Sequence, residues 1–287
     1  MEPLISIGIP TYNRPQSLRS TLKSITSQTH RNLDIVVSDN GSTSSETEEV
    51  VRAFMKDDPR IRFFRQNENK GSAFNYDFVA QQANSEYFIW AADDDKWEST
   101  NLLEGLSRHA QNHALTFPNC NLSSQNRVIE RSHLDVYKDC VTPMEYLLRW
   151  CGHGTGYPFY GLYNRKVMKE ENISFVFDRD LSYYNEGTFL HRVFLNGKVK
   201  FVPDVYITFS TDSNKPDNQK LADDFKKYFV RTLLIYGQSE LDEAAKEKIY
   251  STIIDNYTRY LVSLQSEASL QRKMYRKMRA LLFRAIR

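Results

Sequence analysis

The sequence predicts an α/β fold, in which a doubly wound sheet of mixed strand direction is followed by a helical C-terminal extension. Short β-branched and aromatic runs alternate with amphipathic helical patterns through the first hundred residues. Polar clusters follow these runs, at the carboxyl ends of strands, where the ligands of such sheets bind. From about Gln219 the pattern is helical to the end of the sequence.

The composition is that of an ordinary soluble globular protein. Hydrophobic residues make up 40% of the chain and charged residues 26%, and the formal net charge of +2 does not favour a nucleic acid partner. Cys120, Cys140 and Cys151 lack CxxC spacing, so we expect neither a disulfide framework nor a zinc site. Because the sequence shows no membrane-length apolar run and no signal-peptide pattern, we expect a cytoplasmic protein.

Four strand-to-helix units are predicted in the first hundred residues. The first strand stops at Pro10, and Pro15 stands at the first helical position, which proline favours. Leu18, Leu22 and Ile25 then recur at i, i+4 and i+7 along one buried helix face. The strands are expected over residues 4–9, 33–38, 61–64 and 87–92, and the later helices over about 44–56, 72–82 and 98–111. This alternation predicts parallel strands.

The next segment returns to a strand at 114–117. Thr142 and Glu145 form a capping box that opens a helix through Trp150. Residues 151–157 are predicted to be a flexible Gly-rich loop, which lacks the Lys-Ser/Thr ending of a phosphate loop.

A further strand is expected at 160–163, and a helix follows Glu186. Gly197 stands just past the end of that helix as a C-terminal cap. Residues 198–209 are predicted to form a closing pair of strands around Pro203.

Three consecutive carboxylates, Asp93, Asp94 and Asp95, end the fourth strand. Adjacent negative charges repel one another, so a folded chain tolerates them best beside a cation or in open water. Such oxygen ligands suit Mg²⁺ or Mn²⁺ held together with substrate phosphates. A solvated acidic turn is the alternative. Polar clusters at two other strand ends and at one helix-opening loop favour a nucleotide site: residues 10–13, 39–42 and 69–71.

Six short motifs stand in order in the first hundred residues. They are Ile9-Pro10-Thr11-Tyr12-Asn13-Arg14, Leu18 with Leu22, Ser27-Gln28-Thr29, Val37-Ser38-Asp39-Asn40-Gly41-Ser42, Asn69-Lys70-Gly71 with Asn75, and Ala92-Asp93-Asp94-Asp95-Lys96-Trp97. In this order they resemble the nucleotide-binding half of family 2 glycosyltransferases, which have the Rossmann-like GT-A fold. The rest of the chain matches more loosely. The resemblance implies inverting transfer of a sugar from a nucleotide-activated donor to an acceptor hydroxyl.

The resemblance also assigns the donor-binding residues. Asp39 would accept a hydrogen bond from the base; the alternative is that it caps the next helix. Lys70 would offset phosphate charge, or remain a solvated surface lysine. The loop residues that would pack on the base and ribose are Pro10, Thr11, Tyr12 and Asn13. The donor-binding set is completed by Asn69, Gly71, Asn75 and Asp93.

In this family the acidic motif is usually Asp-x-Asp-Asp-x-Trp. Anchoring on Trp97 puts Ala92 at the first acid and Asp94 at the metal ligand, whereas a literal Asp-x-Asp pattern pairs Asp93 with Asp95. We expect Asp94 and Asp95 to be the metal ligands, with Asp93 near the ribose or a metal-bound water. Mn²⁺ or Mg²⁺ would neutralise charge on the leaving nucleoside diphosphate, for which UDP is the favoured nucleotide.

Inverting transfer needs one carboxylate to take the proton of the acceptor hydroxyl. Family members carry it at the start of a helix with an aromatic residue three positions on, which Glu186 and Phe189 match. Glu186 is therefore the expected base and Asp180 the second choice. Charge complementarity at a helix N-terminus is the alternative role for Glu186. His153 and His191 are candidates to complete the metal shell, or are structural histidines.

We expect a GT-A domain at 1–212, with a nucleotide-binding half at 1–112 and an acceptor half at 113–212. The helical extension at 213–287 ends in a basic amphipathic tail, 271–287, with seven Lys or Arg and no acid. This tail predicts peripheral contact with anionic lipid on the inner face of the membrane, or packing on the protein or a partner.

The resulting hypothesis is a metal-dependent inverting glycosyltransferase that adds single sugars during surface polysaccharide or lipid-linked glycan assembly. Two alternatives stay open. A non-catalytic sugar-nucleotide or glycan-binding protein would keep the fold, although the acid triplet and Glu186 argue against it. A sugar-1-phosphate nucleotidyltransferase would need a Gly-rich loop with an Arg after the first strand, which this sequence does not supply.

Overall fold

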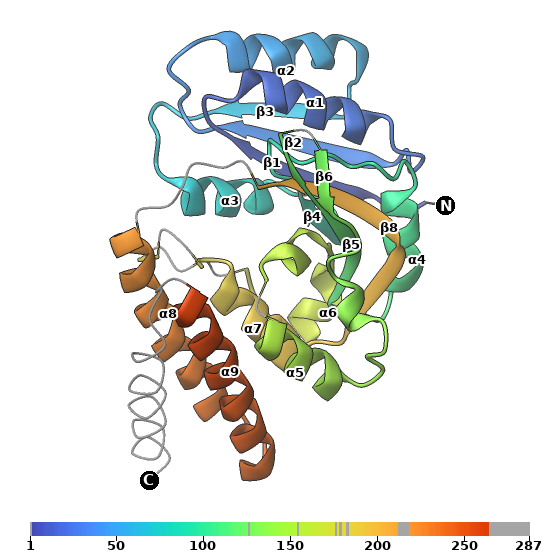
Figure 1. Cartoon of the computed structure of the whole chain (residues 1–287). Helices are drawn as coiled ribbons and strands as arrows, with labels where there is room; N and C mark the ends of the chain where they lie inside the picture. Colours follow the sequence, from blue (N-terminus) through green and yellow to red (C-terminus); the bar gives the residue numbers. More distant parts are fainter. Residues whose placement is uncertain are drawn as a thin grey trace.

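A mixed sheet of eight strands organises the part of the chain that the computed structural model describes (Figure 1). The described residues are 2–125, 127–153, 155–175, 177, 180–181, 184–211 and 218–263. The strands are β1 (Ile5–Thr11), β2 (Leu33–Asp39), β3 (Ile61–Arg65), β4 (Tyr87–Trp90), β5 (Leu115–Ser124), β6 (Arg127–Glu130), β7 (Leu162–Asn164) and β8 (Val199–Ser210). The helices are α1 (Pro15–Thr26), α2 (Glu46–Asp57), α3 (Ser72–Gln81), α4 (Leu102–Ala110), α5 (Pro143–His153), α6 (Arg165–Glu170), α7 (Gly187–Asn196), α8 (Asn218–Gly237) and α9 (Glu243–Ser263), with short 3₁₀ turns η1 (Asp135–Tyr137) and η2 (Tyr157–Tyr160).

The first four strands are parallel and lie in the order β3-β2-β1-β4. Figure 1 shows α1 and α2 on one side of this parallel part and α3 on the other. The register pairs Thr11 with Asp39 at the carboxyl ends of β1 and β2. The loops that follow these strands therefore emerge together, as the predicted alternation of strand and helix requires.

The second part of the sheet reverses direction. β7 lies between β4 and β5 and is antiparallel to both, while β8 runs parallel to β5. This insertion joins the two halves of the chain into one sheet and makes it mixed. The predicted fold class is confirmed, including its helical C-terminal region.

The predicted pair of strands around Pro203 is wrong. Residues 199–210 form the single strand β8, and its register against β5 shifts between Pro118 and Asn119. The shift leaves residues 203–205 out of the ladder as a bulge. Proline is tolerated there because its missing N–H costs no inter-strand hydrogen bond.

Helix α5 runs to His153, beyond the predicted end at Trp150, so the first residues of the expected Gly-rich loop are helical. Its capping box is confirmed. Glu145 Oε2 accepts from the Thr142 backbone N–H at 2.8 Å, and Thr142 Oγ1 accepts from the Glu145 N–H at 3.3 Å. Gly197 follows α7 as predicted.

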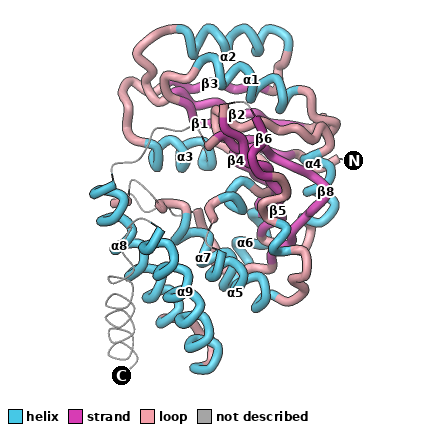
Figure 2. The backbone as a smooth tube through the Cα atoms, in the orientation of Figure 1, coloured by secondary structure: helices cyan, strands magenta, loops and turns pink. Residues whose placement is uncertain are grey.

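The C-terminal region is helical where it is described. Figure 2 shows α5, α7, α8 and α9 gathered on the side of the sheet away from α1 and α2. None of the described helices is long and apolar enough to cross a membrane. The basic tail at 271–287 lies outside the described residues.

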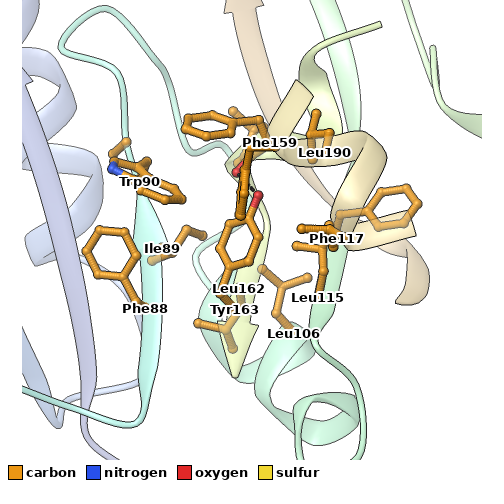
Figure 3. Packing of buried hydrophobic residues seen from close by; sticks show 14 of the residues in the cluster. Phe88, Ile89, Trp90, Leu106, Leu115, Phe117, Phe159, Leu162, Tyr163 and Leu190 are labelled. Carbon is orange, nitrogen blue, oxygen red and sulfur yellow. Dashed lines mark hydrogen bonds between the residues drawn. The ribbon is translucent and has the colours of Figure 1, made fainter. Parts of the chain in front are cut away.

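An aromatic cluster around Trp90 joins the two halves (Figure 3). Trp90 is fully buried at the end of β4. Its ring stacks on Phe159 at 4.5 Å and meets the edges of Tyr163 at 5.3 Å and Phe189 at 6.3 Å, which come from η2, β7 and α7. Aromatic pairs at these distances stabilise a core beyond the area they bury. The cluster therefore fixes α7 against the end of β4.

Candidate active site

Two loops are tied together at the carboxyl ends of β1 and β2. The Asn13 N–H donates to Ser42 Oγ at 2.8 Å, and Asn13 Oδ1 accepts from the Thr43 N–H at 2.8 Å. Asn13 has a φ of 54°, a left-handed conformation that asparagine tolerates better than most residues. Pro10 is buried within β1, whereas Tyr12 is 37% exposed at the rim. Asn13 thus shapes the site, and Tyr12 is the member of this loop open to a ligand.

Asp39 is completely buried, and its two carboxylate oxygens differ. Oδ1 accepts from the Ser42 N–H at 2.9 Å and the Ser42 Oγ at 2.5 Å. Oδ2 is buried and has no hydrogen-bond partner among the described residues; Arg65 Nε lies 3.7 Å away. A buried acceptor without a donor is costly, so Oδ2 is suited to an N–H group of a ligand. The alternative role is not observed, since the N-cap of α2 is Ser45.

The loop before α3 is held by a side-chain network. Asn40 Nδ2 donates to Asn69 Oδ1 at 2.9 Å and to the Gly71 carbonyl at 3.0 Å, and Asn40 Oδ1 accepts from the Lys70 N–H at 3.1 Å. Gly71 has a φ of 87°, which glycine adopts without strain. Lys70 is exposed, and its Nζ lies 4.9 Å from the Phe74 ring centroid. Asn69 therefore builds the loop, and the Lys70 ammonium remains open to an anionic ligand.

Asn75 is a buried tie between strands. Its Nδ2 donates to the Ser38 carbonyl at 2.9 Å and to the Thr11 carbonyl at 3.4 Å. The Oδ1 atom has no hydrogen-bond partner among the described residues. Asn75 thus holds the ends of β1 and β2 in place.

Asp93 and Asp94 converge on one guanidinium. Arg14 Nη1 lies 3.1 Å from Asp93 Oδ1 and 2.5 Å from Asp94 Oδ2, and Thr11 Oγ1 donates to Asp93 Oδ2 at 2.7 Å. Burial raises the pKa of Asp93 to about 6, against the opposing effects of Arg14 and Thr11. Asp93 Oδ1 and Asp94 Oδ2 thus approach the same positive group. Paired carboxylate oxygens of this kind also fit a divalent metal ion, which prefers oxygen ligands.

Asp95 is turned away from that pair. Its Oδ2 accepts from the Ala92 N–H at 2.9 Å, and its backbone carbonyl accepts from Thr21 Oγ1 at 2.9 Å. Burial, opposed by the Ala92 hydrogen bond, raises the pKa of Asp95 well above its usual value. Asp94 is thus brought together with Asp93 and not with Asp95. The role of the Asp95 carboxylate is to close the turn. The described residues contain no group of three or more His, Cys, Asp or Glu side chains arranged for a metal. A metal bound here would need further ligands from the substrate.

Glu186 occupies the N-cap position of α7, but its side chain makes no capping hydrogen bond. The alternative role, charge complementarity with the helix N-terminus, needs no such hydrogen bond and stays a prediction. Burial raises the pKa of Glu186, although a hydrogen bond from its own backbone opposes the effect. A Cβ added at Gly156 would lie 3.1 Å from Glu186 Oε1. The carboxylate thus packs directly against the backbone at Gly156.

A pair of tyrosines connects Glu186 with the acid triplet. The hydroxyls of Tyr76, in α3, and Tyr160, in η2, lie 3.1 Å apart. Burial raises the pKa of Tyr76, the hydrogen bond with Tyr160 opposes this, and the charges of Asp95, Asp93 and Glu186 raise it further. Burial likewise raises the pKa of Tyr160, with contributions from Tyr76, Asp95 and Glu186. The carboxylates of both halves therefore act on the same two hydroxyls.

The remaining predicted residues lie apart from this arrangement. The side chain of Asp180 is 77% exposed and accepts from Arg231 Nη2 at 3.0 Å, so it lacks the burial that would make it a strong base. His153 Nε2 is buried without a hydrogen-bond partner among the described residues, and its ring packs 5.2 Å from that of His133.

His191 is a structural histidine. Its Nδ1 accepts from Trp150 Nε1–H at 3.1 Å and lies 2.7 Å from the Tyr236 hydroxyl, and its Nε2 lies 2.9 Å from the Tyr228 hydroxyl. Burial lowers its pKa to about 3. Both ring nitrogens are occupied by protein groups, so the alternative of a metal-ligating His191 is wrong.

A family model described as Glycosyl transferase family 2 matches residues 6–171, more than half of the chain. The chain belongs to glycosyltransferase family 2. The predicted family is confirmed, and with it the predicted enzyme class at the level of the family. The match also favours this enzyme class over the nucleotidyltransferase alternative.

The matches between this family 2 chain and two curated relatives span only part of each relative's length. The GalNAc(5)-diNAcBac-PP-undecaprenol beta-1,3-glucosyltransferase of Campylobacter jejuni is 29% identical over 190 residues, which is 65% of this chain and 58% of that protein. The putative colanic acid biosynthesis glycosyl transferase WcaA of Escherichia coli is 33% identical over 120 residues, or 41% of this chain and 42% of that protein.

Solved structures show the same fold. S. aureus TarS 1–349 superposes with a TM-score of 0.71 at 18% identity, covering 93% of this chain and 76% of that one. Its complex with UDP-GlcNAc gives a TM-score of 0.70. The mannosyltransferase PcManGT from Pyrobaculum calidifontis, in complex with GDP-Man and Mn²⁺, gives 0.61 at 13% identity and covers 99% of this chain and 81% of its own.

The sequence patterns of this glycosyltransferase gave no role to Arg14, Tyr76 or Tyr160. Arg14 belongs to the first motif, and its charge beside a site rich in carboxylates was the available signal. Tyr76 and Tyr160 are 84 positions apart and carry no spacing that links them. Their partnership arises only from the packing of α3 against η2.

Proposed function

We propose that the chain is a metal-dependent inverting glycosyltransferase that moves one sugar from a UDP-sugar to an acceptor hydroxyl. One observation carries this proposal. Glu186, from the second half of the chain, and Asp95, from the first, both raise the pKa of Tyr76 and of Tyr160, whose hydroxyls lie 3.1 Å apart. The candidate base and the acid triplet thus lie near the same pair of tyrosines, which come from α3 and η2.

The donor base would bind at Asp39. Its unpaired Oδ2 would accept the ring N–H of uracil, beside the half-exposed Tyr12. Guanine also presents ring N–H donors, so the acceptor oxygen alone does not choose the base. UDP is our choice because TarS, which shares the fold, is solved in complex with UDP and with UDP-GlcNAc, although PcManGT, also of this fold, is solved with GDP-Man.

Mn²⁺ or Mg²⁺ would be held by Asp94 together with Asp93 and the donor phosphates. When bound, the ion neutralises negative charge on the leaving nucleoside diphosphate. The fit rests on the carboxylate oxygens that converge on Arg14 Nη1. The Asp95 carboxylate closes the turn by accepting from the Ala92 N–H, and the carboxylates of Asp93 and Asp94 are directed to Arg14.

Glu186 would act as the general base. It takes the proton of the acceptor hydroxyl while that oxygen forms a bond to the anomeric carbon and the bond from this carbon to the diphosphate oxygen breaks. The attack opposes the leaving group, so the configuration inverts. A carboxylate whose pKa is raised by burial is the stronger base, which suits it for this step.

The acceptor would be a lipid-linked or surface glycan. The Campylobacter jejuni relative is named for a glycan on a diphosphate lipid, and the Escherichia coli relative for colanic acid biosynthesis.

We expect a location on the cytoplasmic face of the membrane, with residues 271–287 in contact with anionic lipid. Deleting residues 271–287 is expected to release the protein from anionic liposomes, and unchanged binding would refute this contact.

The central experiment compares Glu186→Gln with the wild type. Calorimetry of UDP with Mn²⁺ should give the same affinity within about twofold, because Glu186 contacts no part of the donor-base site. Turnover of UDP-sugars should fall by about 10²–10⁴. Glu170→Gln, an exposed glutamate in α6, is the matched control and should keep full turnover. Wild-type turnover in Glu186→Gln would overturn Glu186 as the base, and absence of UDP binding in the wild type would overturn the donor site.

A further inference from the structure

A pocket lies between α5, η1 and α9, on elements that the proposed transfer reaction does not use. Its volume is about 530 Å³. Figure 1 shows α5 and α9 side by side, and Asn256 Nδ2 in α9 donates to the Cys151 carbonyl of α5 at 3.1 Å. The walls are therefore fixed relative to each other.

The lining of this pocket is cationic. Arg149 of α5 and Lys248 and Arg259 of α9 surround it, with Glu145 as the single carboxylate among its lining residues. Glu145 Oε2 is already committed to the backbone N–H groups of residues 141 and 142, at 2.8 Å each. Among the described residues, Arg149 and Lys248 form no ion pair with an acid, and Arg149 shares one hydrogen bond with the Cys140 thiol. Their charges are thus available to a ligand.

One histidine lines the pocket and a second packs behind it, where its Nδ1 lies 2.6 Å from Glu130 Oε1. His153 lines it, and its Nε2 is buried without a hydrogen-bond partner among the described residues; the same holds for Nε2 of His133, whose ring is 5.2 Å away. Burial and then the charge of His133 lower the pKa of His153; the charge of Glu130 opposes this, and Arg149 and Arg259 lower the pKa further. Buried ring nitrogens without partners are unusual in native proteins. An anion that accepts from the ring would satisfy one of them and oppose the surrounding positive charge.

We infer that this pocket binds a phosphate or diphosphate group. Two guanidinium groups and an ammonium group offer many N–H donors, which match the several oxygens of a phosphate or diphosphate. A single carboxylate has only two oxygens and would leave more of these donors without a partner. Arg259 is held in place, since its Nη2 donates to the Gly152 carbonyl at 3.3 Å and its Nε to the Asp255 carbonyl at 3.3 Å. The remaining N–H groups of Arg259 are free of these bonds and serve the ligand. The inference does not depend on the reaction at Glu186.

The test uses the full chain in metal-free buffer, so that the proposed donor site is not charged with metal. Calorimetry with inorganic pyrophosphate is expected to show saturable binding. Arg149→Gln and Lys248→Gln should each weaken it about tenfold, the value of one charge-assisted hydrogen bond. Arg108→Gln, an exposed arginine of α4 outside the pocket, is the matched control and should bind as the wild type does. Both pocket side chains are exposed, so thermal melting should show that the variants fold normally.

A second arm identifies the source of the phosphate. Sedimentation with phosphatidylcholine vesicles, with and without phosphatidic acid, is repeated for the same variants. Loss of binding to the phosphatidic acid vesicles in Arg149→Gln and Lys248→Gln supports a lipid headgroup, and loss of pyrophosphate binding alone supports a soluble ligand. Unchanged affinity of Arg149→Gln and Lys248→Gln for both probes would overturn the inference.

Discussion

The unpaired oxygen of Asp39 makes Asp39→Asn a sharp test of the donor site. In the variant, the amide oxygen is expected to keep the bonds that Oδ1 receives from Ser42 at 2.9 and 2.5 Å. The amide NH₂ then takes the place of Oδ2. It presents a donor to the base N–H, where the wild type presents an acceptor.

The expected cost follows from that exchange. A hydrogen bond to a charged group contributes about 1.5–3 kcal/mol, so the affinity for UDP should fall about 10- to 150-fold. Folding should change little. The Arg65 contact at 3.7 Å is long and Arg65 is 35% exposed, so its loss costs less than about 1 kcal/mol.

The assay is calorimetry of UDP in the presence of Mn²⁺, together with urea denaturation. Glu68→Gln is the matched control: it removes one exposed carboxylate whose backbone lies against Gly41 in the neighbouring loop. This control separates the hydrogen bond from the net charge of the rim. Should Asp39→Asn bind UDP within twofold of the wild type, the role of Asp39 in reading the base is refuted.

Three further predictions concern the rest of the site. Because the folded pKa of His191 is about 3, against an ordinary 6.5, the unfolded chain takes up the proton first as the pH falls below 6.5. The free energy of unfolding should drop by about 2 kcal/mol at pH 5 through this group, a loss absent from urea titrations of His191→Gln. Gly156→Ala puts a Cβ 3.1 Å from Glu186 Oε1 and should lower turnover about tenfold at unchanged UDP affinity; unchanged turnover would contradict the packing argument. Tyr160→Phe leaves the Tyr76 hydroxyl unpaired and should lower the free energy of unfolding by about 1–3 kcal/mol. Adding Tyr76→Phe should restore part of this loss. Equal stability of the single and the double variant would argue against the hydroxyl pair.

The parallel half of the sheet could be predicted because each of its strands is a short apolar run between turn residues. The boundaries agree within a few residues, from the strand before Pro10 to the strand at Trp90. The second half was harder. β7 overlaps the strand expected at 160–163, but its place between β4 and β5 comes from tertiary pairing, of Leu162 with Ile89 and of Tyr163 with Leu115, which no local pattern encodes. In β8, the bulge allowed a strand to continue through a proline that normally ends one.

The acid triplet illustrates a second limit. In the sequence Asp93, Asp94 and Asp95 are chemically identical; the spacing to Trp97 indicated Asp94, whereas a literal Asp-x-Asp pattern paired Asp93 with Asp95. The turn separates them, because the Asp95 carboxylate reaches back to the Ala92 N–H while Arg14 collects the other two. Which oxygen faces outward depends on backbone dihedrals that no residue pattern encodes. The assignment of Asp94 as a metal ligand stays a prediction, and the proposed site replaces its predicted partner Asp95 with Asp93, because the Asp95 carboxylate is held by the Ala92 N–H.

The aromatic cluster at Trp90 has a consequence for protein engineering. Trp90 ends the fourth strand of the first half, yet its ring contacts come largely from the second half: Phe159, Tyr163, Phe175, Phe177 and Phe189. Chimeras that exchange whole halves between homologues would therefore mismatch a buried seam and lose stability before any change in specificity could be seen. Grafts limited to the loops after β1 and β2 leave the seam intact. Donor preference should be transferable by such loop exchange, and by that route alone without redesign of the core.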